Sequence, residues 1–541
     1  MQALRARLRY LFARDVGPQN HLIARWIFLR SLGLIYFSVF FALLFQVRGL
    51  IGSQGILPAA GYLQRLHHFG LLRFWYAPSL AWLSASDSML VGLCWLGLVA
   101  SVLVVANILP RAALILCFLC FLSFIGVSQD FGEYQSDGML LEAGFLSLFI
   151  APSGLLPGWG RQSPPVRAAI LLLLWEWFRI YFESGVVKLR SGDPTWYNLT
   201  AMYEYYQNGP LPTWIGWYLQ HFPNWFHVGT AGATLAMELL LIWMALLPRR
   251  WRIACFWIVT LWQAGVILTA NYAFLNYLVL VLGFLLLDDH YLARFVPQRW
   301  RSSFQQQAES AALNESLPEE EAESSPPSPH RLSSLSFWIQ PVVAGFFLIW
   351  IGYATTTQLV QMLWTRAQLP SGPVTLLEPF RVANAYGLFA VMTPHRYEIE
   401  FQGSDDGQTW IPYLFQYKPQ DVHERPRIYA PYQPRFDWNL WFASLGPWQQ
   451  SPIVPLTEER LLENDSAVLA LFRGNPFPQH PPRYVRAVLW QYWFSTPEQK
   501  HDSALWWRRQ LLGTFAPTLE KLPDGEFGEV SASELTGPPE N

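Results

Sequence analysis

Residues 167–190 read Arg-Ala-Ala-Ile-Leu-Leu-Leu-Leu-Trp-Glu-Trp-Phe-Arg-Ile-Tyr-Phe-Glu-Ser-Gly-Val-Val-Lys-Leu-Arg, a long apolar stretch with ionisable side chains in its centre. A helix needs about 20 mostly apolar residues to cross the hydrocarbon core of a bilayer. The spacing therefore predicts a membrane span over residues 167–187. Glu176, Arg179 and Glu183 follow one another at intervals of three and four residues, so they share one face of that helix and can pair.

Eight further apolar stretches indicate that the chain crosses the membrane repeatedly. Of its 541 residues, 52% are hydrophobic and only 14% are charged, a balance that is typical of membrane proteins. The nine predicted spans are residues 26–46, 89–109, 111–128, 138–153, 167–187, 230–247, 253–270, 272–288 and 337–358. We expect a polytopic α-helical membrane protein of about nine transmembrane helices.

Arginine residues concentrate in every second loop of this arrangement. They occur before residue 15, at Arg111, at Arg161 and Arg167, and in residues 248–252. Loops with an excess of positive charge stay in the cytoplasm. The N-terminus is therefore predicted to be cytoplasmic, and the region after the ninth span exoplasmic.

The expected domain boundaries follow from these spans and from composition. A run of Glu, Ser and Pro in the loop before the ninth span cannot form a core. We expect a multi-span domain at 1–288 with an exoplasmic loop at 190–229, a disordered cytoplasmic linker at 289–336, a last transmembrane helix at 337–358, an exoplasmic β-rich domain at 365–514 and a disordered tail at 515–541.

The C-terminal region changes periodicity. Polar and apolar residues alternate in 396–401, and the turn at 403–410 contains Asp-Gly, so the pattern predicts a strand, a turn and a strand. Residues 483–494 predict a later long strand, while 435–445 and 451–472 are typical of helices. We infer a small, β-sandwich-like exoplasmic domain with helical insertions.

Composition excludes several classes of site. A formal net charge of −2 without a long basic run gives no reason to expect a nucleic-acid partner. The four cysteines lie in apolar stretches, so no disulfide framework is expected outside the membrane. Cys117 and Cys120 have the spacing of a redox motif, but their apolar surroundings indicate a structural role. No metal site and no cofactor is predicted.

Ionisable groups within a span cost several kcal/mol unless they are paired or face water. Glu176, Arg179 and Glu183 therefore indicate either a functional cavity or an ion-paired bundle core. Lys188, at the exoplasmic end of the same helix, could extend toward lipid headgroups.

Two groups of residues form recognisable motifs. The first comprises Gly185, Lys188, Arg190, Asp193, Trp196, Thr200, Met202, Tyr206, Pro210, Pro212, Tyr218, His221 and Pro223. The second comprises Lys418, Pro419, Gln433, Pro434, Arg435, Asp437, Trp438, Arg483, Tyr484 and Arg486. Both resemble the most characteristic stretches of the lipase maturation factor family, in the same order, and the resemblance covers roughly residues 20–500.

The resemblance implies a membrane-embedded, chaperone-like factor that helps secreted lipases, in particular homodimeric ones, to fold and assemble in the endoplasmic reticulum. It implies no catalytic step; the partners would be a secreted lipase or another exported client and the lipid bilayer. The chain departs from that setting because its lysines are few and its exoplasmic part has no cysteine. We therefore expect a bacterial inner membrane rather than an endoplasmic reticulum membrane.

Two other functions stay open. Residues 185–189 are also similar to a Gly-Val-Lys-Lys-Leu stretch of vitamin K-dependent carboxylases, in which the second lysine is a catalytic base, and Lys188 has that position. A lysine acts as a base only if its pKa falls from about 10.4 toward neutrality. Transport is the second alternative, with Glu142, Glu238 and Gln263 joining the charged face of 167–187.

A folding helper needs apolar surface where its client emerges. Aromatic residues after the fifth span could supply that surface or anchor the loop at the membrane interface. These residues are Trp214, Trp217, Tyr218, Trp225 and Phe226.

Overall fold

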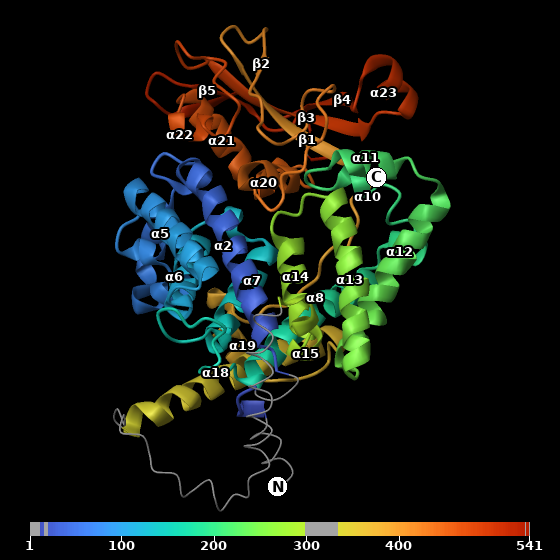
Figure 1. Ribbon diagram of the computed structural model, residues 1–541. Coiled ribbons are helices and arrows are strands. Elements are labelled where there is room, and N and C mark those ends of the chain that lie inside the picture. The colour runs from blue at the N-terminus through green and yellow to red at the C-terminus, as the bar shows by residue number, and fades with distance from the viewer. Residues whose placement is uncertain (1–10, 16–19, 298–333, 536, 540–541) are drawn as a thin grey trace, which may run out of the picture.

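The computed structural model describes residues 11–15, 20–297, 334–535 and 537–539. Helices form an elongated bundle, and a β-sheet covers the end of the bundle opposite Leu22, where α2 begins (Figure 1). Helices α20 (Arg435–Ala443), α21 (Ile453–Leu462) and α22 (Ser466–Leu469) lie on the bundle side of the sheet. The molecule therefore has a bundle, a thin helical layer and a sheet.

Each of the nine predicted spans coincides with helical structure where the chain is described. The corresponding helices are α2 (Leu22–Ile51), α5 (Asp87–Ala106), α6 (Pro110–Ile125), α7 (Gln135–Ile150), α8 (Arg167–Arg190), α12 (Asn224–Leu239) with η4 (Leu241–Leu246), α13 (Arg249–Thr269), α14 (Leu275–Gly283) with η5 (Phe284–Leu286), and α18 (Ser334–Leu363). Within the described residues, five helices are long and apolar enough to cross a membrane: α2, α5, α12 with η4, α13 and the part of α18 from Val342 to Leu363. The chain is an integral membrane protein, and the number nine stays a prediction.

Shorter helices fill the connecting segments. They are α3 (Ala59–Leu66), η1 (His67–Leu72), α4 (Arg73–Tyr76), η2 (Leu80–Trp82), η3 (Gln129–Gly132), α9 (Pro194–Tyr197), α10 (Tyr205–Asn208), α11 (Trp214–Gln220), α15 (Asp289–Leu292), η6 (Ala293–Phe295), α19 (Gly372–Thr375), η7 (Glu378–Phe380), η8 (Trp448–Gln450) and α23 (Pro497–Ser503). Several begin at side chains that suit a helix start, such as Asp193 before α9 and Thr213 before α11, whose oxygens accept backbone N–H bonds.

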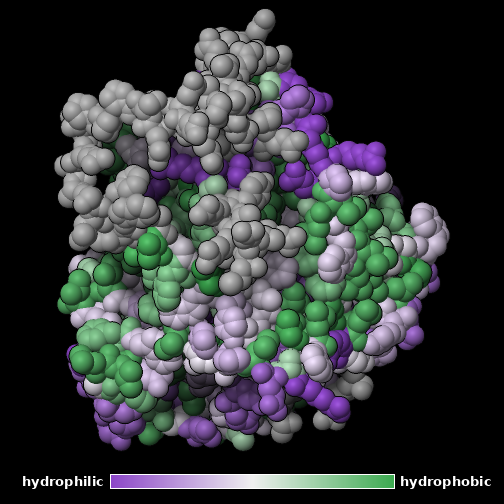
Figure 2. Space-filling model, turned by 90° about the horizontal axis from the view of Figure 1, so that it is seen from below, coloured by the Kyte–Doolittle hydropathy of each residue, from purple (hydrophilic) through white to green (hydrophobic). Residues whose placement is uncertain are grey.

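The outer helices present apolar side chains outward. Trp95 on α5, Trp225 on α12, and Trp257 and Leu261 on α13 are all exposed. Hydrophobic residues also gather in broad areas of the face that is seen from below (Figure 2). A soluble protein would not expose so much apolar surface, so these areas are suited to contact with lipid.

The loops that the arginine pattern assigned to one side do meet at one end of the bundle. Arg25 donates to the carbonyl oxygens of Trp159 and Ser163, Arg111 donates to Ala151, and Arg249 pairs with Asp288. The sheet lies at the other end (Figure 1). The structure thus groups these loops together, whereas their cytoplasmic location stays a prediction.

The predicted linker begins later than expected. Residues 289–297 are folded, because Asp289 accepts hydrogen bonds from the backbone N–H groups of Leu22 and Ile23 at 3.0 and 2.7 Å and so caps α2. Residues 334–336 already belong to α18. The remainder of the predicted linker, 298–333, lies outside the described residues.

The C-terminal domain contains one antiparallel sheet of six strands. The strands are β1 (Arg396–Ser404), β2 (Ile411–Pro412), β3 (Tyr484–Phe494), β4 (Trp507–Thr514), β5 (Thr518–Lys521) and β6 (Phe527–Ser531). Their order is β2-β1-β3-β5-β6, and β4 also pairs with β3. The expected β-sandwich is wrong, because the described residues form a single sheet. Helices α20 and α21 cover its inner face in place of a second sheet.

The expectation of a disordered tail from residue 515 is also wrong. Phe515 and Ala516 are fully buried, β5 pairs with β3, and β6 pairs with β5. Pro523-Asp-Gly525 forms the turn between the last two strands, with Gly525 at a φ of 90° that favours glycine. The Pro and Gly residues that suggested disorder therefore form a hairpin turn.

Candidate functional site

The ionisable face of α8 is buried among other helices. Glu176, Arg179 and Glu183 have no exposed surface. Arg179 forms a close ion pair with Glu142 of α7, and its guanidinium lies 3.9 Å from Glu183. The predicted pairing within α8 is therefore present between Arg179 and Glu183, but the strongest partner comes from another helix.

The segment 382–393, called the strap, follows η7 and leads up to β1 through the bundle. Its backbone is irregular, so its N–H groups need partners inside the bundle. Tyr386 donates its N–H to Glu183 at 2.7 Å, and Asn384 donates its N–H to Glu142 at 3.0 Å. Ser184 accepts the N–H of Leu388 at 3.2 Å.

The strap also supplies acceptors. Arg179 donates to the carbonyl oxygen of Asn384, and the Tyr386 hydroxyl donates to Glu142 at 2.8 Å. Non-helical backbone inside a membrane protein is tolerated only where protein groups satisfy it. Arg179 and Glu183 therefore fasten the strap, which favours the ion-paired core over a functional cavity at these two residues. The carboxylate oxygens of Glu176 are buried without a hydrogen-bond partner among the described residues.

Lys188 is the next polar residue along α8, and it too binds the strap. Its ammonium pairs with Glu238 of α12 at 2.9 Å and donates to the carbonyl oxygen of Leu388 at 3.0 Å. The ring of Trp196 lies 5.2 Å away. Lys188 therefore joins α8 to α12 and to the strap.

The loop 190–229 continues this fastening. Asp193 accepts the N–H of Met392 at 2.7 Å, and Trp196 donates its indole N–H to Phe389 at 3.1 Å. Nearer the sheet, Gln207 accepts the N–H of Phe494 at 2.9 Å. Asp193 and Trp196 of the first motif therefore hold the strap, and Gln207 of the same loop, outside the motif, holds the sheet.

The remaining residues of the first motif have structural surroundings as well. Gly185 permits close packing, because a Cβ there would lie 2.9 Å from Glu238 and Leu239. Arg190 donates to the last carbonyl oxygens of α18. Met202 and Tyr206 are buried, Tyr218 accepts a bond from Lys500, and His221 bonds to the carbonyl of Trp217. Pro223 precedes α12, Thr200 and Pro210 lie between the short helices, and Pro212 forms a β-bridge with Ala270.

Arg435 and Asp137 form the central ion pair between bundle and sheet. Both are buried, and the guanidinium makes two bonds of 2.8 Å to the carboxylate. Such bidentate pairs are strong and directional. The backbone N–H of Arg435 also donates to Gln46 of α2 at 2.7 Å. The start of α20, which follows Gln433 and Pro434, is therefore attached to both α7 and α2.

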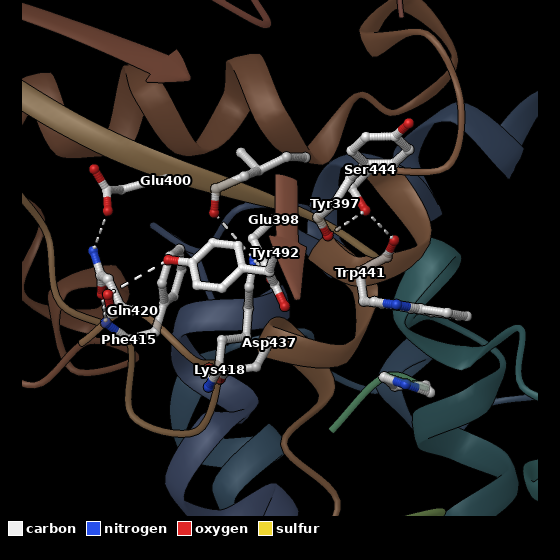
Figure 3. Close-up of polar contacts among 12 residues, drawn as sticks. Tyr397, Glu398, Glu400, Phe415, Lys418, Gln420, Asp437, Trp441, Ser444 and Tyr492 are labelled. Atoms are coloured by element: carbon white, nitrogen blue, oxygen red, sulfur yellow. Dashed lines mark hydrogen bonds and ion pairs between the residues drawn. The ribbon is translucent and has the colours of Figure 1, made fainter. Parts of the chain in front are cut away.

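Lys418 and Asp437 belong to a polar cluster beneath β1 (Figure 3). Lys418 pairs with Glu398 at 2.8 Å and donates to the carbonyl of Ile399 at 3.0 Å. Asp437 accepts the N–H groups of Tyr417 and Lys418. Burial raises the pKa of Asp437 to about 6, while the nearby Lys418 ammonium lowers it.

Three residues of the second motif lie apart from the rest. Arg483 is exposed and lies 3.7 Å from Glu520, whereas Arg486 donates to Gln402 and covers the ring of Trp410. Tyr484 begins β3. The structure does not bring these three to the contact between bundle and sheet, so the second motif divides into two places.

A cleft of about 690 Å³ opens between the bundle and the C-terminal domain. Its walls come from the segment before and within α7, from α20, and from the strap. The walls include the aromatic residues Tyr134, Trp438, Trp441 and Phe442. Phe442 is half exposed and lies near Tyr134, with ring centroids 5.9 Å apart. We call this space the seam cleft.

Sequence reasoning missed most of the seam cleft and the strap. Asn384 and Tyr386 lie outside the motif sets, and Asp137 falls one residue before a predicted span, whereas Phe442 lies in the stretch 441–443 that belongs to the second match to the family. Of the predicted client-contact aromatics, Trp217 is buried and bonds to Ser495 at 3.2 Å, so it cannot contact a client directly. Trp225 is 74% exposed. Among the described residues, no group of three His, Cys, Asp or Glu side chains could hold a metal ion.

Known proteins match this chain along most of its length. A family described as "Lipase maturation factor transmembrane domain" matches residues 23–294, and one described as "Lipase maturation factor C-terminal domain" matches residues 382–517. "Lipase maturation factor 2" of Gallus gallus is 32% identical over 92% of this chain and 81% of its own length. "Lipase maturation factor 1" of Mus musculus is 30% identical over 96% of this chain and 90% of its own length. No solved structure matches.

The pair of Lys188 and Glu238 allows a test of a structural role against a catalytic one. We predict that Lys188→Met destabilises the protein by about 3–5 kcal/mol, because it leaves Glu238 buried without its partner. The double variant Lys188→Met/Glu238→Met should recover much of that loss. Thermal unfolding in detergent measures both. Recovered stability without recovered function in the double variant would favour Lys188 as a base.

Asp437 should make the stability of the C-terminal domain depend on pH. Because its pKa is about 6 in the folded protein and 3.8 when unperturbed, the folded state holds the proton more tightly. Its contribution to stability is then complete below pH 4 and is lost as the pH rises to about 6. Asp437→Asn should flatten this part of the unfolding profile, whereas Asp405→Asn, at an exposed position, should leave it unchanged. An unaltered profile in Asp437→Asn would contradict the assignment.

Proposed function

The chain belongs to the lipase maturation factor family, and from this premise we propose that it assists the folding, assembly or maturation of a secreted lipase or another exported client. The names of the relatives support lipase maturation as the role. A chaperone-like mechanism at the seam cleft is our own inference. The following observations support it.

The seam cleft carries this proposal. Its volume of about 690 Å³ and its aromatic walls suit an apolar segment of an incompletely folded chain. Phe442 and Val391, which are 47% and 67% exposed, offer apolar surface that no described residue covers fully. Such surface is the physical requirement for a protein that binds clients before they have buried their own apolar residues.

The position of the cleft suits a client that emerges from the membrane. It lies between the helical bundle and the sheet, at the bundle end opposite the arginine-rich loops. If those loops are cytoplasmic, as the positive-inside rule predicts, the cleft and the sheet are exoplasmic. A bacterial inner membrane, favoured above by the arginine-rich composition, stays a prediction.

A non-catalytic role fits the chemistry of the buried charges. Glu142, Arg179, Glu183 and Lys188 all bind the strap or one another, so they support neither a lysine base nor a path for a transported ion. We therefore propose that the polar groups of the bundle position the seam cleft and that the cleft acts on the client without a covalent step.

A client-maturation assay tests the proposal. Phe442→Ala should lower the specific activity of a co-expressed secreted lipase severalfold, because a buried aromatic contact at an interface is worth about 2 kcal/mol or more. The amount of lipase synthesised should not change. Phe295→Ala is the matched control, since Phe295 is 64% exposed at the opposite end of the bundle. Equal lipase activity with both variants, at equal membrane abundance, would refute a client role for the seam cleft.

A further inference from the structure

A second cavity, of about 330 Å³, lies within the bundle, between α8, α12, α13 and α14. Phe389 of the strap lines both this cavity and the seam cleft. Most of its other walls are apolar, including Ile180, Val266 and Val279. Four of its wall residues, Lys188, Trp196, Met202 and Tyr206, belong to the first motif, and the others belong to neither motif.

The cavity follows one face of α12. Phe226, Thr230, Thr234 and Glu238 all line it, and they recur every four residues. At 1.5 Å per residue this stripe extends about 18 Å, so the space is long rather than round. The hydroxyls of Thr230 and Thr234 donate to the carbonyls of Phe226 and Thr230, which leaves their methyl groups for contact with a ligand.

The cavity opens toward the outer face of the bundle. Leu261, which is 71% exposed, and Gly265 contribute to its wall. A Cβ at Gly265 would meet nothing within 4 Å. α13 packs against η4 and α11, at the two ends of α12, and the two helices diverge toward the sheet (Figure 1). In a bilayer this opening faces hydrocarbon chains.

Among the described residues, the side-chain amide of Asn276 is hydrogen-bonded through its oxygen alone. The Tyr181 hydroxyl donates to the side-chain oxygen of Gln263 at 3.0 Å, and the NH₂ group of Gln263 donates to the side-chain oxygen Oδ1 of Asn276 at 2.7 Å. This chain of bonds occupies the side-chain oxygen of Asn276 and leaves its NH₂ group without a hydrogen-bond partner in the part of the chain that the structure describes. Asn276 is 5% exposed and lines the cavity, so its NH₂ needs an acceptor from a ligand.

The charges of the cavity select a neutral acceptor. Lys188 already has Glu238 and the carbonyl of Leu388 as partners, so it has little capacity for another anion. The Glu238 carboxylate on the same wall would repel a carboxylate ligand. An ester carbonyl accepts a hydrogen bond without bringing a charge into the cavity.

We propose that this cavity binds one acyl chain of a bilayer glycerolipid, with the ester carbonyl accepting a hydrogen bond from Asn276. The chain lies along the Phe226 to Glu238 face of α12 and enters between α12 and α13. The bound lipid packs against Phe389 and thereby contacts the same strap that forms a wall of the seam cleft.

Photocrosslinking of the full-length protein in phosphatidylcholine nanodiscs tests this site. The probe is phosphatidylcholine with a diazirine in the middle of one acyl chain. Mass spectrometry should locate crosslinks at Thr230 and Thr234. Gly265→Phe, which fills the opening, should lower these crosslinks about tenfold. Gly229→Phe is the matched control, because Gly229 is a glycine of α12 outside the cavity wall whose Cβ would also meet nothing within 4 Å.

Competition distinguishes the chemical class of the ligand. Methyl oleate should reduce the crosslinks at Thr230 and Thr234, sodium oleate should not, and Asn276→Leu should remove the preference for the ester. Stronger competition by oleate would overturn the ester assignment. Crosslinks confined to outward positions such as Leu268, with no effect of Gly265→Phe, would overturn the site itself. Equal thermal stability of the two glycine variants confirms that neither result reflects unfolding.

Discussion

Arg179 and the carboxylates of Glu142 and Glu183 are the interaction on which the rest of the structure depends. The strap must pass through the interior of a membrane protein without forming a helix, and each of its N–H groups there needs an acceptor. Glu142 and Glu183 provide acceptors, and Arg179 balances part of their charge while it binds a strap carbonyl. Without these side chains, unpaired backbone groups would be buried at a cost of several kcal/mol.

The strap in turn fixes the C-terminal domain above the bundle. It leads to Arg396 at the start of β1, whose guanidinium donates to the carbonyls of Gln207 and Pro210 at 3.0 and 3.1 Å. A second attachment forms where Arg435 binds Asp137. The seam cleft lies between these two attachments, so its shape depends on buried ion pairs rather than on a flexible hinge. Buried pairs of this kind specify one arrangement of the partners, because removal of either partner leaves an unpaired charge.

Sequence patterns predicted the helices and strands better than they predicted the contacts between them. The nine apolar stretches, the strand 396–401 and the helix 435–445 are all present, because hydrophobic periodicity reflects local structure. The last hairpin was missed because Pro523 and Gly525 resemble disorder in composition. The strap was missed because Asn384 and Tyr386 have no periodic pattern. Their importance arises only from their contacts with α7 and α8, which are remote in sequence.

Hydrogen exchange at the strap tests the central claim most directly. If the α8 and α7 side chains hold the strap within the bundle, the amides of Asn384, Tyr386 and Leu388 exchange with solvent deuterium as slowly as those in the middle of α8. Arg179→Met should accelerate exchange at these amides before it affects β3. Exchange at the strap in the unaltered protein as fast as in the exposed turn at residues 405–409 would contradict the account.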